Sequence, residues 1–185
     1  MSEEMIIKHC SPTLAGIKTG NMFTCPYKSD GELSASLCTW NKALAKKGLR
    51  ILPLKCADGK AIIYIYRRSR LAKDLSDKAV CDILRGFGYD DCTPEKCVAR
   101  LKKRVSDSTG REFPHEIGLF LGYPPEDVLG FIENKAGRFK CAGAWKVYGD
   151  ASAAEKAFAR YKKCTALYCR QYANGSTVER LTVAR

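Results

Sequence analysis

The residues best suited to chemistry lie near the start of the chain, in the segment HCSPTLAGIKTGN at 9–21. This segment brings together an imidazole, a thiol, a hydroxyl, an ammonium and an amide group: His9, Cys10, Ser11, Lys18 and Asn21. We expect a strand to end at Cys10 and a helix to begin at Ser11. Free N–H groups and the positive dipole end at a helix start attract anions and lower the pKa of a nearby thiol.

Two functions fit such a strand-to-helix corner. The first is binding of a small anionic ligand or cofactor by His9, Cys10, Ser11, Lys18 and Asn21. The second is a cysteine-dependent enzyme, in which Cys10 is the nucleophile, a histidine is the base and helix N–H groups stabilise an oxyanion. The glycine spacing matches neither a phosphate-binding loop nor a dinucleotide fingerprint, so both interpretations rest on physical chemistry rather than on a motif.

The second histidine of the chain, His115, stands beside Glu116 and directly after Pro114. One interpretation is a general acid/base pair that contributes to the same site as residues 9–21. The other is an exposed first turn of a helix, in which Glu116 complements the helix dipole. Both interpretations stay open from the sequence.

Residues 114–132, PHEIGLFLGYPPEDVLGFI, have the spacing of a helix-turn-helix. Gly122 would lie in the turn, and Gly118 would allow the two helices to approach. Lys and Arg outnumber Asp and Glu by 32 to 20, and this basic balance suits nucleic acid among other acidic partners. A nucleic-acid-binding or regulatory protein is therefore the alternative function, although Glu126 and Asp127 would face phosphates in a DNA complex.

Ten cysteines without an export signal indicate reduced thiols in a cytoplasmic protein. The pairs Cys92/Cys97 and Cys164/Cys169 are not the close pairs of zinc sites. A metal site assembled from Cys10, Cys141, Cys164 and Cys169 ranks below separate structural thiols, and no metal is predicted. The apolar run at 61–66 is too short to cross a bilayer, so no membrane insertion is expected.

The pattern of expected strands and helices that position these residues predicts an α+β fold in a single domain, 1–185. We expect one mixed sheet of about six strands covered by helices, with a helical segment at 69–136. The first third predicts a strand at 5–10, a helix at 30–47 and a hairpin turn at Asp58-Gly59.

The last third repeats that order. It predicts a strand at 138–148, a helix opened by Ser152, a strand at 165–172 and a second hairpin turn at Asn174-Gly175. The parts 5–67 and 138–184 could thus be βαββ-like halves. Internal duplication and a common economical design both account for this repetition.

Four segments, HCSPTLAGIKTGNMF, FPHEIGLFLGYPPEDVLGFIENK, KCAGAWKVYGD and YKKCTALYCRQ, resemble the bacterial family catalogued as domain of unknown function 3793. The resemblance spans nearly the whole chain. It implies a stand-alone cytoplasmic protein of about this size, mostly from anaerobic Gram-positive bacteria. Such an environment would suit ten reduced cysteines, and the resemblance assigns no catalytic residue.

Overall fold

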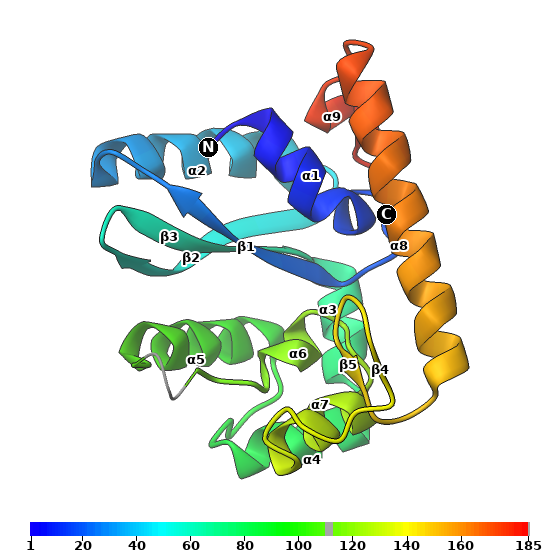
Figure 1. Cartoon of the computed structure of the whole chain (residues 1–185). Coiled ribbons are helices and arrows are strands. Elements are labelled where there is room, and N and C mark those ends of the chain that lie inside the picture. The colour runs from blue at the N-terminus through cyan, green and yellow to red at the C-terminus, as the bar shows by residue number, and fades with distance from the viewer. Residues whose placement is uncertain (110–112, 185) are drawn as a thin grey trace.

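A three-stranded antiparallel sheet separates two layers of helices in the computed structural model, which describes residues 1–109 and 113–184 (Figure 1). The strand order is β1-β3-β2, and the strands are β1 (Gly20–Pro26), β2 (Leu49–Ala57) and β3 (Lys60–Arg67). Asp58 and Gly59 both have positive φ, at 51° and 69°, so the predicted β2–β3 hairpin turn is confirmed.

The central strand β3 is buried on both of its faces. Ile63 and Ile65 point into one helical layer, while Tyr64 and Tyr66 point into the other. A strand covered on both faces is apolar at successive positions rather than at alternate ones. This explains the continuous run AIIYIY.

One layer contains α1 (Glu3–Leu14), α2 (Asp30–Ala45) and the short α9 (Val178–Leu181). It lies above the sheet in Figure 1. The predicted helix at 30–47 is confirmed, with Leu33 and Leu44 buried and Leu37 and Trp40 packed against the same core.

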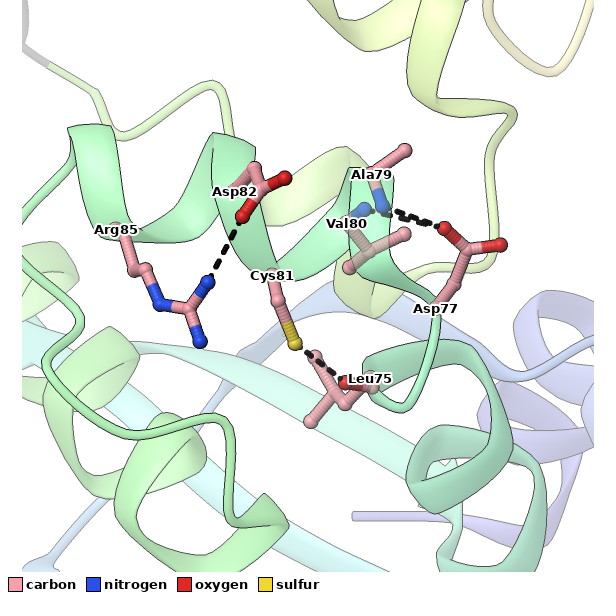
Figure 2. Close-up of polar contacts among 7 residues, drawn as sticks. All are labelled: Leu75, Asp77, Ala79, Val80, Cys81, Asp82 and Arg85. Atoms are coloured by element: carbon pink, nitrogen blue, oxygen red, sulfur yellow. Dashed lines mark hydrogen bonds and ion pairs between the residues drawn. The ribbon is translucent and has the colours of Figure 1, made fainter.

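The other layer holds the predicted helical segment, which is also confirmed. Its helices are α3 (Arg68–Leu75), α4 (Lys78–Gly86), α5 (Pro94–Asp107), α6 (Ile117–Phe120) and α7 (Pro125–Glu133). Helix α4 is capped by Asp77, whose carboxylate accepts hydrogen bonds from the N–H groups of Ala79 and Val80 (Figure 2).

The start of the chain is a helix, so the predicted strand at 5–10 is wrong. Ser2 caps α1 by accepting a hydrogen bond from the N–H of Met5, and two glutamates follow in the first turn. The buried residues recur at helical intervals, at Ile6, Ile7, Cys10 and Leu14. Ser11 therefore lies inside this helix and not at the start of a new one.

The last third also differs from the prediction. A single helix, α8 (Ala151–Ala173), replaces the expected second helix and strand, and it packs along α1 (Figure 1). Tyr161, Cys164, Tyr168 and Tyr172 are half-buried and recur at helical spacing. The predicted strand at 165–172 gave more weight to the β-propensity of its residues than to this spacing. Asn174 and Gly175 end this helix, with Gly175 at a φ of 89°, instead of forming a hairpin.

The predicted sheet of about six mixed strands is therefore wrong, although the α+β class is correct. Residues 138–148 contribute only a small separate hairpin, β4 (Cys141–Ala142) and β5 (Lys146–Val147). All strand pairs in the described ranges are antiparallel. Residues 5–67 contain a β-α-β-β order, β1-α2-β2-β3, after α1, whereas the described part of 138–184 has the order β4-β5-α8-α9, so the two parts do not share one order.

A buried arginine at the end of β3 connects several distant segments. The Arg67 guanidinium donates hydrogen bonds to the carbonyls of Thr13 at 2.6 Å, Leu14 at 2.5 Å and Val183 at 2.7 Å. The Arg67 main-chain N–H donates to the carbonyl of Thr19 at 2.9 Å. Arg67 thus holds the end of α1, the start of β1 and the C-terminal segment together.

We expect Arg67→Met to lower the free energy of unfolding by about 4 kcal/mol, because it leaves several buried carbonyls without a donor. Urea unfolding would measure the change. The matched control is Arg85→Met, since Arg85 forms only an exposed ion pair with Asp82 at 2.8 Å (Figure 2). The control should change stability by less than about 0.5 kcal/mol. Equal losses in the two variants would contradict the role of Arg67.

Candidate functional site

The residues predicted to form the corner at 9–21 do not share one site. His9 is exposed and stacks on Phe23, with ring centroids 5.4 Å apart. The Ser11 hydroxyl donates to the carbonyl of Ile7 within α1. Asn21 accepts a hydrogen bond from the Thr13 hydroxyl at 2.7 Å. These side chains therefore support the local structure.

Cys10 lies in the second half of α1 and is fully buried. Burial raises the pKa of its thiol well above the ordinary value, opposite to the direction expected for a helix start. The thiol is thus neutral near pH 7 and out of reach of solvent. The geometry that would make Cys10 a nucleophile is absent.

Of the five residues predicted to form the corner at 9–21, Lys18 is the one that lines the cavity described below. It follows α1 in the loop that leads to β1, and only 5% of its surface is exposed. Its ammonium lies 5.0 Å from the centre of the Tyr123 ring. Burial lowers the pKa of Lys18 to about 8, and the nearby Cys10 opposes this shift. Among the described residues, no carboxylate or other hydrogen-bond acceptor contacts the ammonium.

The space in front of Lys18, here called the Lys18 cavity, has a volume of about 350 Å³. The loop before β1, the helices α3 and α8, and the turn between α6 and α7 meet around it, and Figure 1 shows these elements gathered near the start of β1. Its polar wall consists of Lys18, Thr19, Arg70, Asp74, Asp77, Tyr123, Arg160 and Tyr161.

The carboxylates of the Lys18 cavity are already engaged by the fold. Asp77 caps α4, and Asp74 accepts a hydrogen bond from the Thr19 hydroxyl at 2.5 Å. The pKa of Asp74 is raised, chiefly by burial. The cations of the cavity wall are Lys18, Arg70 and Arg160. Within residues 1–109 and 113–184, the ion pairs use other basic residues, namely Arg85, Lys96 and Arg104. With three cations and two carboxylates in its wall, the cavity keeps an excess of positive charge.

The turn between α6 and α7 shapes one wall of the cavity. Gly122 has a φ of 77°, and a Cβ atom at this position would lie 2.7 Å from the Thr19 hydroxyl oxygen. Glycine is needed here for both the conformation and the close approach. The next residue, Tyr123, stacks on Trp145 with ring centroids 4.8 Å apart, and burial raises its pKa to about 12. Tyr123 is therefore a fixed neutral surface beside Lys18.

His115 and Glu116 do not form an acid/base pair. Glu116 is 1% exposed and accepts hydrogen bonds from Arg104 at 2.5 Å and from Tyr89 at 3.1 Å. His115 is exposed and packs against Phe131 at the edge of a second, mostly apolar cavity of about 170 Å³. Neither His9 nor Cys10 lines that cavity, so the residues of the predicted shared site are separate.

The helix-turn-helix interpretation is also only partly correct. Gly122 forms the turn, and a Cβ atom at Gly118 would lie 2.7 Å from Val128, as the spacing indicated. However, α6 is a single turn of four residues. Asp127 is buried and accepts three hydrogen bonds, from Trp145 and from the N–H groups of Tyr148 and Gly149. This segment is a packing unit that holds the turn beside the Lys18 cavity.

The cysteines do not gather into a chelating set. Within the described ranges, no three His, Cys, Asp or Glu side chains lie close enough together to hold a metal ion. Of the four cysteines considered for such a site, Cys10 is sealed in the core and Cys169 is exposed. No helix in the same ranges has a stretch long and apolar enough to span a bilayer.

Comparison with protein families gives a match over residues 6–182, to the family described as "Protein of unknown function (DUF3793)". The chain belongs to this family. All four segments that resemble the family lie within the matched residues. Neither the curated proteins nor the solved structures contain a match to the chain.

The sequence analysis missed most of the residues that accompany Lys18. Arg70 and Asp74 come from α3, and Arg160 and Tyr161 come from α8, far away in the sequence. Each looks like an ordinary residue of a solvated helix face. One signal was available. The half-buried residues of 161–172 recur at helical spacing, which favours one continuous helix over the predicted strand. That prediction would have placed Arg160 and Tyr161 in the same helix as residues 165–172.

We expect Lys18→Met to stabilise the protein by about 3 kcal/mol at pH 7, because it removes a buried charge whose pKa is lowered from 10.5 to about 8. Below pH 8, Lys18 is protonated in both the folded and unfolded states, and the folded state bears the full cost. Between pH 8 and pH 10.5 only the unfolded chain keeps the proton, so wild-type stability rises relative to the variant. Urea unfolding of both proteins at pH 7 and pH 9.5 would measure this narrowing difference. A difference that stays constant with pH would contradict it.

Proposed function

We propose that the protein binds a small anionic ligand in the Lys18 cavity. The observation that carries this proposal is Lys18, which is 5% exposed and lines the cavity, and whose ammonium has no hydrogen-bond acceptor among the described residues. A buried charge without a partner is costly unless a counter-charge is supplied. An anion in the cavity would supply it.

The charges around Lys18 support an anion rather than a cation. Arg70 and Arg160 add two guanidinium groups to the wall, and such groups recognise carboxylate and phosphate with paired hydrogen bonds. The two carboxylates of the wall are held by Thr19 and by the first turn of α4. At pH 7 most Lys18 side chains keep their charge, since the pKa is about 8.

The size of the cavity favours a small molecule. A volume of about 350 Å³ lies at the lower end of the range for small-ligand sites. This proposal keeps the anionic ligand expected from the sequence but moves its site from His9, Cys10, Ser11 and Asn21 to the Lys18 side of the loop. The alternative of nucleic-acid binding has lost the support of a helix-turn-helix, because α6 is one turn long.

The test is the thermal stability of the full chain with inorganic phosphate, pyrophosphate or citrate at constant ionic strength. A ligand that binds only the folded state raises the melting temperature, and tenfold excess over Kd adds about 1.4 kcal/mol. We expect at least one of these anions to stabilise the wild type, and Lys18→Met to abolish that increment. Arg70→Met should weaken the apparent affinity by about tenfold, as expected for loss of one charged hydrogen-bonding group.

The matched control is Lys8→Met, which removes an exposed lysine of α1. It should keep the full increment of the wild type. An increment that persists in Lys18→Met would place the anion elsewhere on the basic surface and contradict the proposal. The absence of an increment with all three anions in the wild type would also contradict it.

A further inference from the structure

We infer that Lys18 is a nucleophile, and that its side-chain nitrogen forms an imine with a small carbonyl compound that carries a carboxylate or phosphate group. This inference rests on the proposed anion site and adds a reaction to it. The geometry points to this chemistry because an amine and anion-binding groups line one pocket that is open to solvent.

The first support is the position of the Lys18 nitrogen. The side chain is 5% exposed and lies over the Tyr123 ring, 5.0 Å from its centre, while its end opens into the cavity. Lysines used for imine formation are typically set in desolvated surroundings or close to other cationic groups. Lys18 meets the first condition, because only 5% of its surface is exposed, while Arg70 and Arg160 line other parts of the cavity wall.

The second support is the supply of neutral amine, because only the unprotonated form attacks a carbonyl carbon. With a pKa of about 8, about one Lys18 side chain in ten is neutral at pH 7. An ordinary lysine, with a pKa near 10.5, is neutral in roughly one copy in three thousand. The nearby Cys10 opposes this shift, but burial of Lys18 is the larger effect.

The third support is the division of tasks within the cavity. Arg70 and Arg160 can hold the carboxylate or phosphate of the ligand by charged hydrogen bonds, which leaves Lys18 for the carbonyl group. The Asp74 carboxyl lines the same cavity and accepts a hydrogen bond from the Thr19 hydroxyl, and burial raises its pKa. A single small molecule can therefore meet both types of group within about 350 Å³.

The reaction balances without an oxidant or reductant. The Lys18 nitrogen loses one proton, its lone pair forms a bond to the carbonyl carbon, and the carbonyl π electrons move to oxygen. The resulting hydroxyl takes up protons and leaves as water, while the nitrogen closes the C=N bond. Ammonium plus carbonyl thus give a protonated imine plus water.

The test is reductive trapping of the full chain at pH 7 with three two-carbon aldehydes: glyoxylate, glycolaldehyde phosphate and uncharged glycolaldehyde. Cyanoborohydride delivers hydride to the imine carbon and converts it to a stable amine, which peptide mass spectrometry locates. We expect Lys18 to be modified at least about tenfold faster than exposed Lys8 by one or both anionic aldehydes. The faster of the two indicates whether the ligand carries a carboxylate or a phosphate.

Rates at Lys8 correct for the intrinsic reactivity of each aldehyde. After this correction, uncharged glycolaldehyde should show a smaller preference for Lys18 than the anionic aldehydes, because it gains from the neutral amine but not from anion binding. Arg70→Met should reduce the preference for the anionic aldehydes. Lys18→Arg supplies the decisive control, since it keeps a cation for anion binding but has no amine that forms an imine. It should retain phosphate stabilisation and show no adduct at position 18.

The outcomes separate the two proposals. If Lys18 is modified no faster than Lys8 while phosphate, pyrophosphate or citrate still stabilises the wild type through Lys18, imine formation is wrong and anion binding stands. If Lys18 is modified rapidly but equally by charged and uncharged aldehydes, the inference of an anionic carbonyl compound is wrong. If neither stabilisation nor preferential modification occurs, both proposals are wrong.

Discussion

Arg67 is the constraint on which the geometry of the site depends. Its guanidinium binds the carbonyls of Thr13 and Leu14, just before the loop that carries Lys18, and its main-chain N–H binds the carbonyl of Thr19, just after it. One residue thus fixes both ends of this short loop. Because Arg67 also closes the central strand, the position of the Lys18 amine is tied to the sheet and not to a flexible connection.

The fold uses its buried carboxylates for structure and leaves cations for the cavity. Glu116 neutralises Arg104, Asp127 binds three donors of the β5 region, and Asp77 caps α4. Each of these acids holds two segments or one helix end in place. Some of the excess of basic residues appears at the Lys18 cavity, where Lys18, Arg70 and Arg160 outnumber Asp74 and Asp77. Part of the net charge of +12 is therefore concentrated at one cavity.

Local sequence signals predicted much of the first two-thirds of the fold, but they missed the helix at 3–14 and the strand at 20–26. The Asp58-Gly59 turn and the apolar stripe of α2 act within a few residues, so they can be recognised in isolation. The errors at 5–10 and 165–172 have one cause: β-branched and aromatic residues were given more weight than helical spacing. At Ile6 and Tyr168 the packing of α1 against α8 overrides local propensity. The site was less predictable, because Lys18 meets Arg70 and Arg160 only after three elements pack together.

Lys18 is best understood from the conflict between its charge and its surroundings. The chain could fill the same space with an apolar side chain of similar length and avoid the cost of burying an ammonium without a partner. Stability alone therefore does not account for a lysine at this position. An anion in the cavity offsets the cost by pairing with the charge, and an imine keeps the positive nitrogen while adding a covalent bond to its ligand. Destabilised groups of this kind are typical of functional sites, where folding and function place different demands on one residue.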